Sequence, residues 1–112
     1  MMAFFPDAAN WPKSFPSGVV EVKIRVSKKI RLHCLLLKSI SSNAILYLQG
    51  NAGHIADRLS TLQTLNSFGQ NVLGVGYRGY GKSTGRPSEE GIYQDAEICL
   101  NYLINKLNIP EE

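Results

Sequence analysis

Cysteine and histidine, which build metal and redox sites, are scarce in this sequence. Its only cysteines, Cys34 and Cys99, stand far apart inside apolar segments, and no C-x-x-C pair occurs. His33 and His54 are isolated as well, so the chain has no Cys/His ligand cluster and we expect no metal and no cofactor. Two buried free thiols in a reducing compartment are the better interpretation, which predicts a cytoplasmic protein.

An excess of one charge and long apolar runs are also lacking. The net charge is only +3, and the basic residues are scattered among the acids. Without a basic stripe, nucleic-acid binding is not expected. No apolar stretch reaches the roughly 20 residues of a membrane-spanning helix, and residues 1–10 lack the basic start and apolar run of a signal peptide. We therefore expect neither a nucleic-acid partner nor a membrane partner.

The 112 residues, 44% of them hydrophobic, are enough for one domain or part of one. Residues 1–17 are rich in proline and aromatic residues, which predicts an extended lead-in, and residues 18–112 form the domain. Val19–Val26 alternates apolar and charged residues, as a strand with one wet face does. A short turn leads to a second strand, Ile30–Leu37, and so predicts an antiparallel hairpin.

Two later segments, Ala44–Leu48 and Val72–Val75, are apolar throughout. Such strands are typical of a parallel sheet with helices on both faces. Between them, apolar residues recur from Ile55 to Leu65 at helical spacing, which predicts a right-handed crossover unit. A further amphipathic helix begins after Ser88, which is a good N-cap. The fold class is therefore α/β.

A glycine-rich stretch between the last strand and the last helix contains three overlapping motifs. Gly76–Ser83 fits the phosphate loop G-x-x-x-x-G-K-S, and Gly74–Gly79 fits the dinucleotide motif G-x-G-x-x-G. Gly81–Gly85 fits the nucleophile elbow G-x-S-x-G. At most one of the three can be real.

The following residues argue against all three motifs. A phosphate loop needs a helix that begins at its Lys-Ser pair, but Pro87 prevents a helix before Ser88. The same objection applies to a nucleophilic Ser83, after which no histidine follows. The dinucleotide motif fails because Gly79 lies within a loop. A P-loop-like nucleotide-binding module using Gly76–Ser83 remains the alternative function.

Taken together, three segments carry a resemblance to a known family. Residues 46–53 (LYLQGNAG) resemble the HGNAG segment of α/β-hydrolases, and residues 76–83 (GYRGYGKS) resemble their DYRGYGKS segment. Residues 87–96 resemble the helix that follows. The order and spacing match the bud-emergence-suppressor type of serine hydrolase from about Gly18 to the end.

The resemblance implies an N-terminal part of an α/β-hydrolase sheet: a β-hairpin, two parallel strands joined by a crossover helix, and a following helix. It also implies that the loop after Ala44–Leu48 donates a backbone N–H to the oxyanion hole, from Asn51 or its neighbour Ala52. A plain tight turn is the open alternative for this loop. Gln49 stands where the family usually has histidine, and Gly76 where it usually has aspartate, which would loosen the oxyanion loop.

In this family the serine, the acid and the histidine of the catalytic triad come later than the last helix seen here. We therefore expect a truncated serine hydrolase, related to enzymes that cleave esters, thioesters or peptides, with no catalytic residue and no activity alone. The family's sheet order would leave Ala44–Leu48 as an exposed edge. We expect this edge to support self-association or the binding of a complementing C-terminal half.

Overall fold

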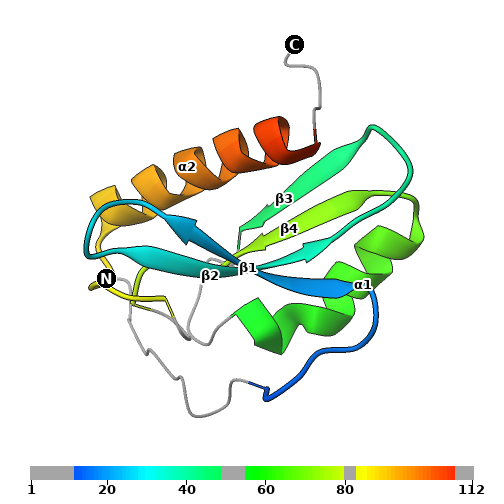
Figure 1. Ribbon diagram of the computed structural model, residues 1–112, viewed down its shortest axis with the longest axis horizontal. Coiled ribbons are helices and arrows are strands. Elements are labelled where there is room, and N and C mark those ends of the chain that lie inside the picture. The colour runs from blue at the N-terminus through cyan, green and yellow to red at the C-terminus, as the bar shows by residue number, and fades with distance from the viewer. Residues whose placement is uncertain (1–11, 49–54, 80–82, 108–112) are drawn as a thin grey trace.

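The computed structural model describes residues 12–48, 55–79 and 83–107, which form a four-stranded sheet between two helices (Figure 1). Along the sheet the strand order is β1-β2-β4-β3. The strands are β1 (Val19–Arg25), β2 (Arg31–Leu37), β3 (Ala44–Leu48) and β4 (Asn71–Val75). Helix α1 (Leu59–Ser67) and helix α2 (Glu89–Leu107) lie on opposite faces of the sheet. The predicted α/β class and order of elements are confirmed.

The hairpin of β1 and β2 is antiparallel, with Val19 opposite Leu37. Both strands are slightly shorter than expected at the turn, where the N–H of Val26 donates to the carbonyl oxygen of Ile30 at 2.9 Å. These two residues close the turn instead of extending the ladder. β2 is also antiparallel to β4, whereas β3 and β4 are parallel, as their apolar sequences predicted.

The described part of the crossover from β3 to β4 comprises a turn of 3-10 helix, Ile55–Arg58, followed by α1. Gly69 ends it with φ of +85°, a conformation in which glycine avoids the strain of a Cβ. Gly74 permits the close packing of this unit. A Cβ at Gly74 would lie 2.7 Å from Cγ1 of Ile55 and 2.9 Å from Cδ1 of Leu62.

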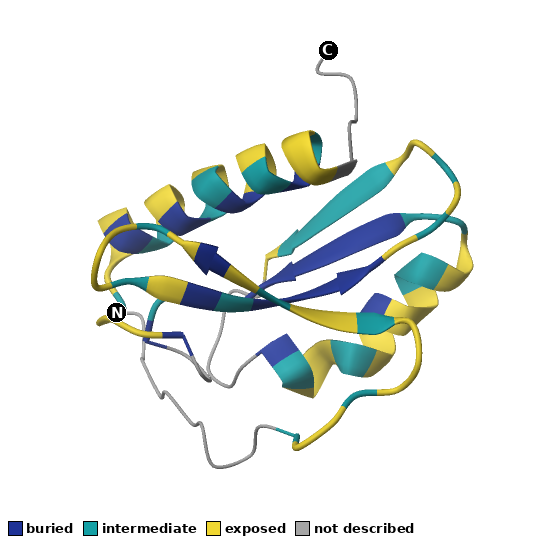
Figure 2. Ribbon diagram, viewed as in Figure 1, coloured by how far each residue is buried: buried dark blue, intermediate teal, exposed yellow. Residues whose placement is uncertain are grey.

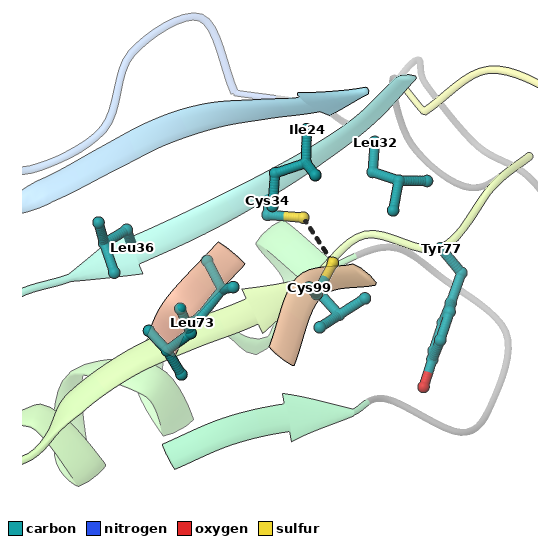
Figure 3. Close-up of a cluster of buried hydrophobic side chains, with 9 residues drawn as sticks. Ile24, Leu32, Cys34, Leu36, Leu73, Tyr77 and Cys99 are labelled. Atoms are coloured by element: carbon teal, nitrogen blue, oxygen red, sulfur yellow. Dashed lines mark hydrogen bonds between the residues drawn. The ribbon is translucent and has the colours of Figure 1, made fainter. Parts of the chain in front are cut away.

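Side chains alternate between two separate apolar cores, one on each face of the sheet. The inner strand β4 is buried along its length, whereas β3 is mostly of intermediate burial (Figure 2). The α2-side core contains Ile24, Leu32, Cys34, Leu36, Leu73, Val75, Tyr77, Cys99 and Leu103 (Figure 3 labels seven of these). The α1-side core contains Leu35, Leu37, Ile55, Leu62 and Val72. Phe15 of the lead-in packs against the α1-side core. The other lead-in aromatics lie outside the described residues.

β3 departs from the expectation that helices cover both of its faces. Its first four residues are only half-buried, and Leu48 is 47% exposed, whereas every residue of β4 is buried. The reason is its place at the edge of the sheet, with β4 on one side only among the described strands. Neither described helix has the length and apolar character that a bilayer crossing requires.

Candidate functional site

The candidate site lies where β3 and β4 end. Because these strands are parallel, the loops that follow them leave the sheet at the same end. β2 runs in the opposite direction, so its first residues lie at this end as well. In α/β sheets of this kind, ligands bind outside the carboxyl ends of the strands.

The loop after β3 carries the expected oxyanion donors. Asn51 and Ala52 lie outside the described residues, as does Gln49, so their assignment stays a prediction. The two residues that flank the loop are described. Leu48 ends β3, and Ile55 is 1% exposed in the α1-side core, where it packs over Gly74. The far end of the loop is therefore fixed against β4.

Ser83 lies in the loop after β4 and is a structural hydroxyl. Its Oγ accepts a hydrogen bond from the N–H of His33 at 2.9 Å and donates to the carbonyl oxygen of Gly76 at 2.8 Å. The side chain is buried at 7% exposure, and it joins the start of β2 to the end of β4. Since α2 begins only at Glu89, Ser83 does not stand on a helix N-terminus as an elbow nucleophile must.

Thr84 fastens the same loop to β2. Its N–H donates to the carbonyl oxygen of Arg31 at 2.9 Å, and its Oγ1 accepts from the N–H of Arg31 at 2.8 Å and donates to the carbonyl oxygen of Lys29 at 2.8 Å. The carbonyl oxygen of Thr84 also accepts from the N–H of Gly79 at 3.0 Å, which closes the loop on itself. Both hydroxyl residues are thus engaged with the main chain.

A buried ion pair ties this loop to α2. Asp95 is fully buried; its Oδ1 accepts from Nη2 and Nε of Arg78 at 2.7 and 3.0 Å, and its Oδ2 accepts from the N–H of Arg78 at 2.8 Å. Three hydrogen bonds satisfy this carboxylate, as a buried charge requires. This ion pair was not predicted from the sequence. The signal was present, because Asp95 is an acid next to Ala96 in the apolar stripe of α2.

Two glycines permit the close packing around this pair. A Cβ at Gly91 would lie 2.8 Å from Cδ of Arg78 and from Oγ of Ser88. Gly79 has φ of +80°, and a Cβ there would overlap Pro87. The predicted N-cap is confirmed, since Oγ of Ser88 accepts from the N–H of Gly91 at 3.0 Å.

The described residues offer no support for a phosphate cradle. The positive end of α2 lies beyond Ser83, and Gly81 and Lys82 are outside the described residues. A groove of about 670 Å³ does run along the start of α2, but its lining includes the carboxylates of Glu90 and Glu97. Carboxylates repel a phosphate ligand.

Gly76, where the resemblance expects aspartate, has no room for a side chain. A Cβ there would overlap the carbonyl oxygen of His33 and lie 3.2 Å from Oγ of Ser83. The main chain at Gly76, directly after β4, therefore packs against the main chain of β2 at His33. Whether the change loosens the neighbouring oxyanion loop stays a prediction.

The described ionisable groups near this end of the sheet do not form a metal site. No group of three potential metal ligands occurs in the described ranges, 12–48, 55–79 and 83–107. Nδ1 of His33 lies 3.8 Å from Oε1 of Glu21 on the neighbouring strand. Tyr77 is 8% exposed, and burial, with smaller contributions from Cys99 and Asp95, raises its pKa to about 12. Its hydroxyl therefore stays protonated at neutral pH.

Comparison with known proteins places this arrangement among hydrolases, although no family model matches the chain. The chain is 38% identical over 98 residues to protein bem46 of Schizosaccharomyces pombe, an alignment that covers 83% of this chain and 33% of bem46. It is 36% identical over 93 residues to the α/β-hydrolase domain-containing protein WAV2 of Arabidopsis thaliana, covering 80% of this chain and 30% of WAV2. The chain thus spans about a third of the length of these curated relatives.

Solved structures give the same fold. An α/β-hydrolase from Vibrio vulnificus aligns with a TM-score of 0.69 and 27% identity, over 83% of this chain and 32% of that one. The esterase Pf2001 of Pyrococcus furiosus aligns with a TM-score of 0.70 and 20% identity, over 94% of this chain and 42% of the esterase. The chain belongs to the α/β-hydrolase superfamily, resembles its bem46-type members, and covers the N-terminal part of their fold.

Proposed function

We propose that this chain is the oxyanion-side scaffold of a serine hydrolase with esterase-type activity. A serine on a segment beyond these residues attacks the carbonyl carbon of the substrate, and the N–H of Asn51, or of Ala52, stabilises the oxyanion that forms. The observation that carries this proposal is the shared end of β3 and β4, where the loop of Asn51 leaves the sheet beside a second, tightly fastened loop.

The fastened loop supports a scaffold role over a catalytic one. The hydroxyl of Ser83 is hydrogen-bonded to the main chain of Gly76 and His33, and the guanidinium of Arg78 is hydrogen-bonded to Asp95. Such contacts hold the loop after β4 in one conformation. The neighbouring oxyanion loop needs a rigid support of this kind to keep its N–H donors in place. On this proposal the 112 residues hydrolyse nothing alone and work in a cytoplasmic, reducing compartment that keeps Cys34 and Cys99 as free thiols.

The exposed edge of β3 supports the partner proposal. The side of β3 that pairs with no other described strand presents backbone N–H and C=O groups that another strand can pair with. We propose that a complementing C-terminal half adds its nucleophile-bearing strand at Ala44–Leu48, and that a second copy of the chain occupies this edge when that half is missing.

The experiment measures fluorophosphonate labelling and ester hydrolysis for the chain alone and after mixing with the C-terminal two thirds of a bem46-type relative. We expect no adduct on the chain alone, and an adduct on the serine of the added segment in the mixture. Asn51→Pro, which removes the backbone N–H, should slow hydrolysis by about 100-fold, whereas the matched Asn51→Ala keeps the N–H and most of the activity.

Two results would contradict the proposal. An adduct on Ser83 of the chain alone, abolished in Ser83→Ala, would make the glycine-rich loop an active site. Equal rates for Asn51→Pro and Asn51→Ala would remove Asn51 from the oxyanion hole, and the same pair of substitutions at Ala52 would then test its neighbour.

A further inference from the structure

The two cysteines of the chain, far apart in the sequence, meet in the α2-side core. Cys34 comes from β2 and Cys99 from α2, and their Sγ atoms are 3.8 Å apart (Figure 3). Both residues are fully buried, and both are free thiols. Sequence spacing gave no hint of this contact, because it depends on how α2 lies across the sheet.

The geometry places the two sulfurs in van der Waals contact, with no other atom needed between them for a bond to form. A disulfide brings two sulfurs to about 2.05 Å, so a bond between them requires the two side chains to rotate toward each other. The pair faces Ile24 and Leu73, which offer no charge to ionise a thiol. A hydrogen bond with Cys34, and then burial, raise the pKa of the Cys99 thiol, so Cys99 stays protonated while the core is closed.

We propose that Cys34 and Cys99 are a redox-sensitive staple, which a low-molecular-weight disulfide of the glutathione type oxidises to a disulfide between β2 and α2. One cysteine thiolate attacks the small disulfide, forming a mixed disulfide and releasing one reduced small thiol. The other cysteine, as its thiolate, attacks the protein sulfur of the mixed disulfide and releases the second small thiol. Two protein thiols are oxidised, one small disulfide is reduced, and two protons are released and taken up by the two leaving thiolates.

Burial determines when this reaction runs. Because both sulfurs are inaccessible in the closed core, the small disulfide reaches them only when α2 lifts transiently from the sheet. Oxidation then fixes α2 in its closed position. Asp95 lies one helical turn before Cys99 and holds Arg78, so the staple also secures the loop after β4 at the candidate site.

The test compares thiol–disulfide equilibria of the chain in glutathione buffers, with and without denaturant. The ratio of linked to reduced protein gives the effective concentration of one thiol at the other. We expect this concentration to be about 30-fold or more higher in the native chain than in the denatured chain. By thermodynamic linkage, the factor by which folding favours the disulfide equals the factor by which the disulfide stabilises the fold, and a disulfide that closes a long loop is stabilising.

Peptide mapping and thermal unfolding complete the experiment. The native chain should yield one unreduced peptide pair that joins Cys34 to Cys99, and its unfolding midpoint should rise on oxidation. The matched variants Cys34→Ser and Cys99→Ser keep the size of the side chain, and their midpoints should not rise in the same buffers. An effective concentration in native buffer no higher than in denaturant, or oxidation that yields only dimers and glutathione adducts, would overturn the proposal.

Discussion

β3 and β4 are parallel neighbours of equal length with similar apolar sequences, yet they are buried to very different extents. Every residue of β4 is buried, whereas no residue of β3 is. The two strands are in register, with Leu46 opposite Leu73 and Ile45 opposite Val72. An apolar sequence allows a strand to be covered on both faces. The position of the strand in the sheet decides whether both faces are in fact covered.

The physical difference lies in the neighbours. β4 has β2 on one side and β3 on the other, and both helices contact it. β3 has one strand neighbour among the described residues, and α2 is the helix that contacts it most. The edge strand therefore keeps part of its apolar surface exposed, while every residue of the inner strand is buried.

The largest effect is expected from truncating the two opposed leucines. Leu73 is fully buried, so Leu73→Ala should lower the free energy of unfolding by about 3 kcal/mol. Leu46 is half-buried, so Leu46→Ala should cost only about 1 kcal/mol. Urea unfolding followed by circular dichroism measures both. Equal losses at low protein concentration would contradict the difference in burial.

An intermediate effect is expected at alkaline pH from Tyr77, which follows β4 into the core. Its folded pKa of about 12 exceeds the ordinary value of 10.0, so the stabilisation is complete below pH 10. Between pH 10 and about 12 the unfolded state loses the proton first, and the free energy of unfolding falls by roughly 2 to 3 kcal/mol. Tyr77→Phe should remove this part of the decline in unfolding experiments under reducing conditions.

The matched control for this prediction is Tyr93→Phe, which removes a hydroxyl from a side chain that is 70% exposed. The free energy of unfolding of Tyr93→Phe should decline with pH in the same way as that of the unmodified chain. A decline that persists in Tyr77→Phe would show that another group dominates; Cys99, whose pKa the hydrogen bond with Cys34 and burial raise, is the first to examine.

The smallest effect on stability is expected at the exposed edge. Ile45→Lys places a charge on β3, which should reduce self-association measured by sedimentation velocity while lowering the free energy of unfolding by less than about 1 kcal/mol. Val20→Lys puts the same charge on β1 at the other edge of the sheet, where Val20 is 49% exposed, and should leave association unchanged. Equal association of all three proteins would place the contact elsewhere.

Much of the fold follows from local sequence pattern. Alternation along β1, helical spacing in α1 and α2, and the cap at Ser88 are properties of neighbouring residues, and all were predicted. The objection to Ser83 as a nucleophile also came from its neighbours, since Pro87 delays the next helix. The family resemblance rests likewise on short contiguous segments, and it led to Asn51 and Ala52, which lie outside the described residues.

Only the tertiary structure decided how distant residues meet. The contact between Cys34 and Cys99, the ion pair of Arg78 with Asp95, and the hydrogen bonds of Ser83 each join segments that the sequence leaves apart. The exposure of β3 also depends on strand order and not on composition; the family resemblance led to the expected edge, and the local sequence pattern did not. Local propensity acts between residues a few positions apart, whereas burial and long-range hydrogen bonds depend on which faces the packed elements present to one another.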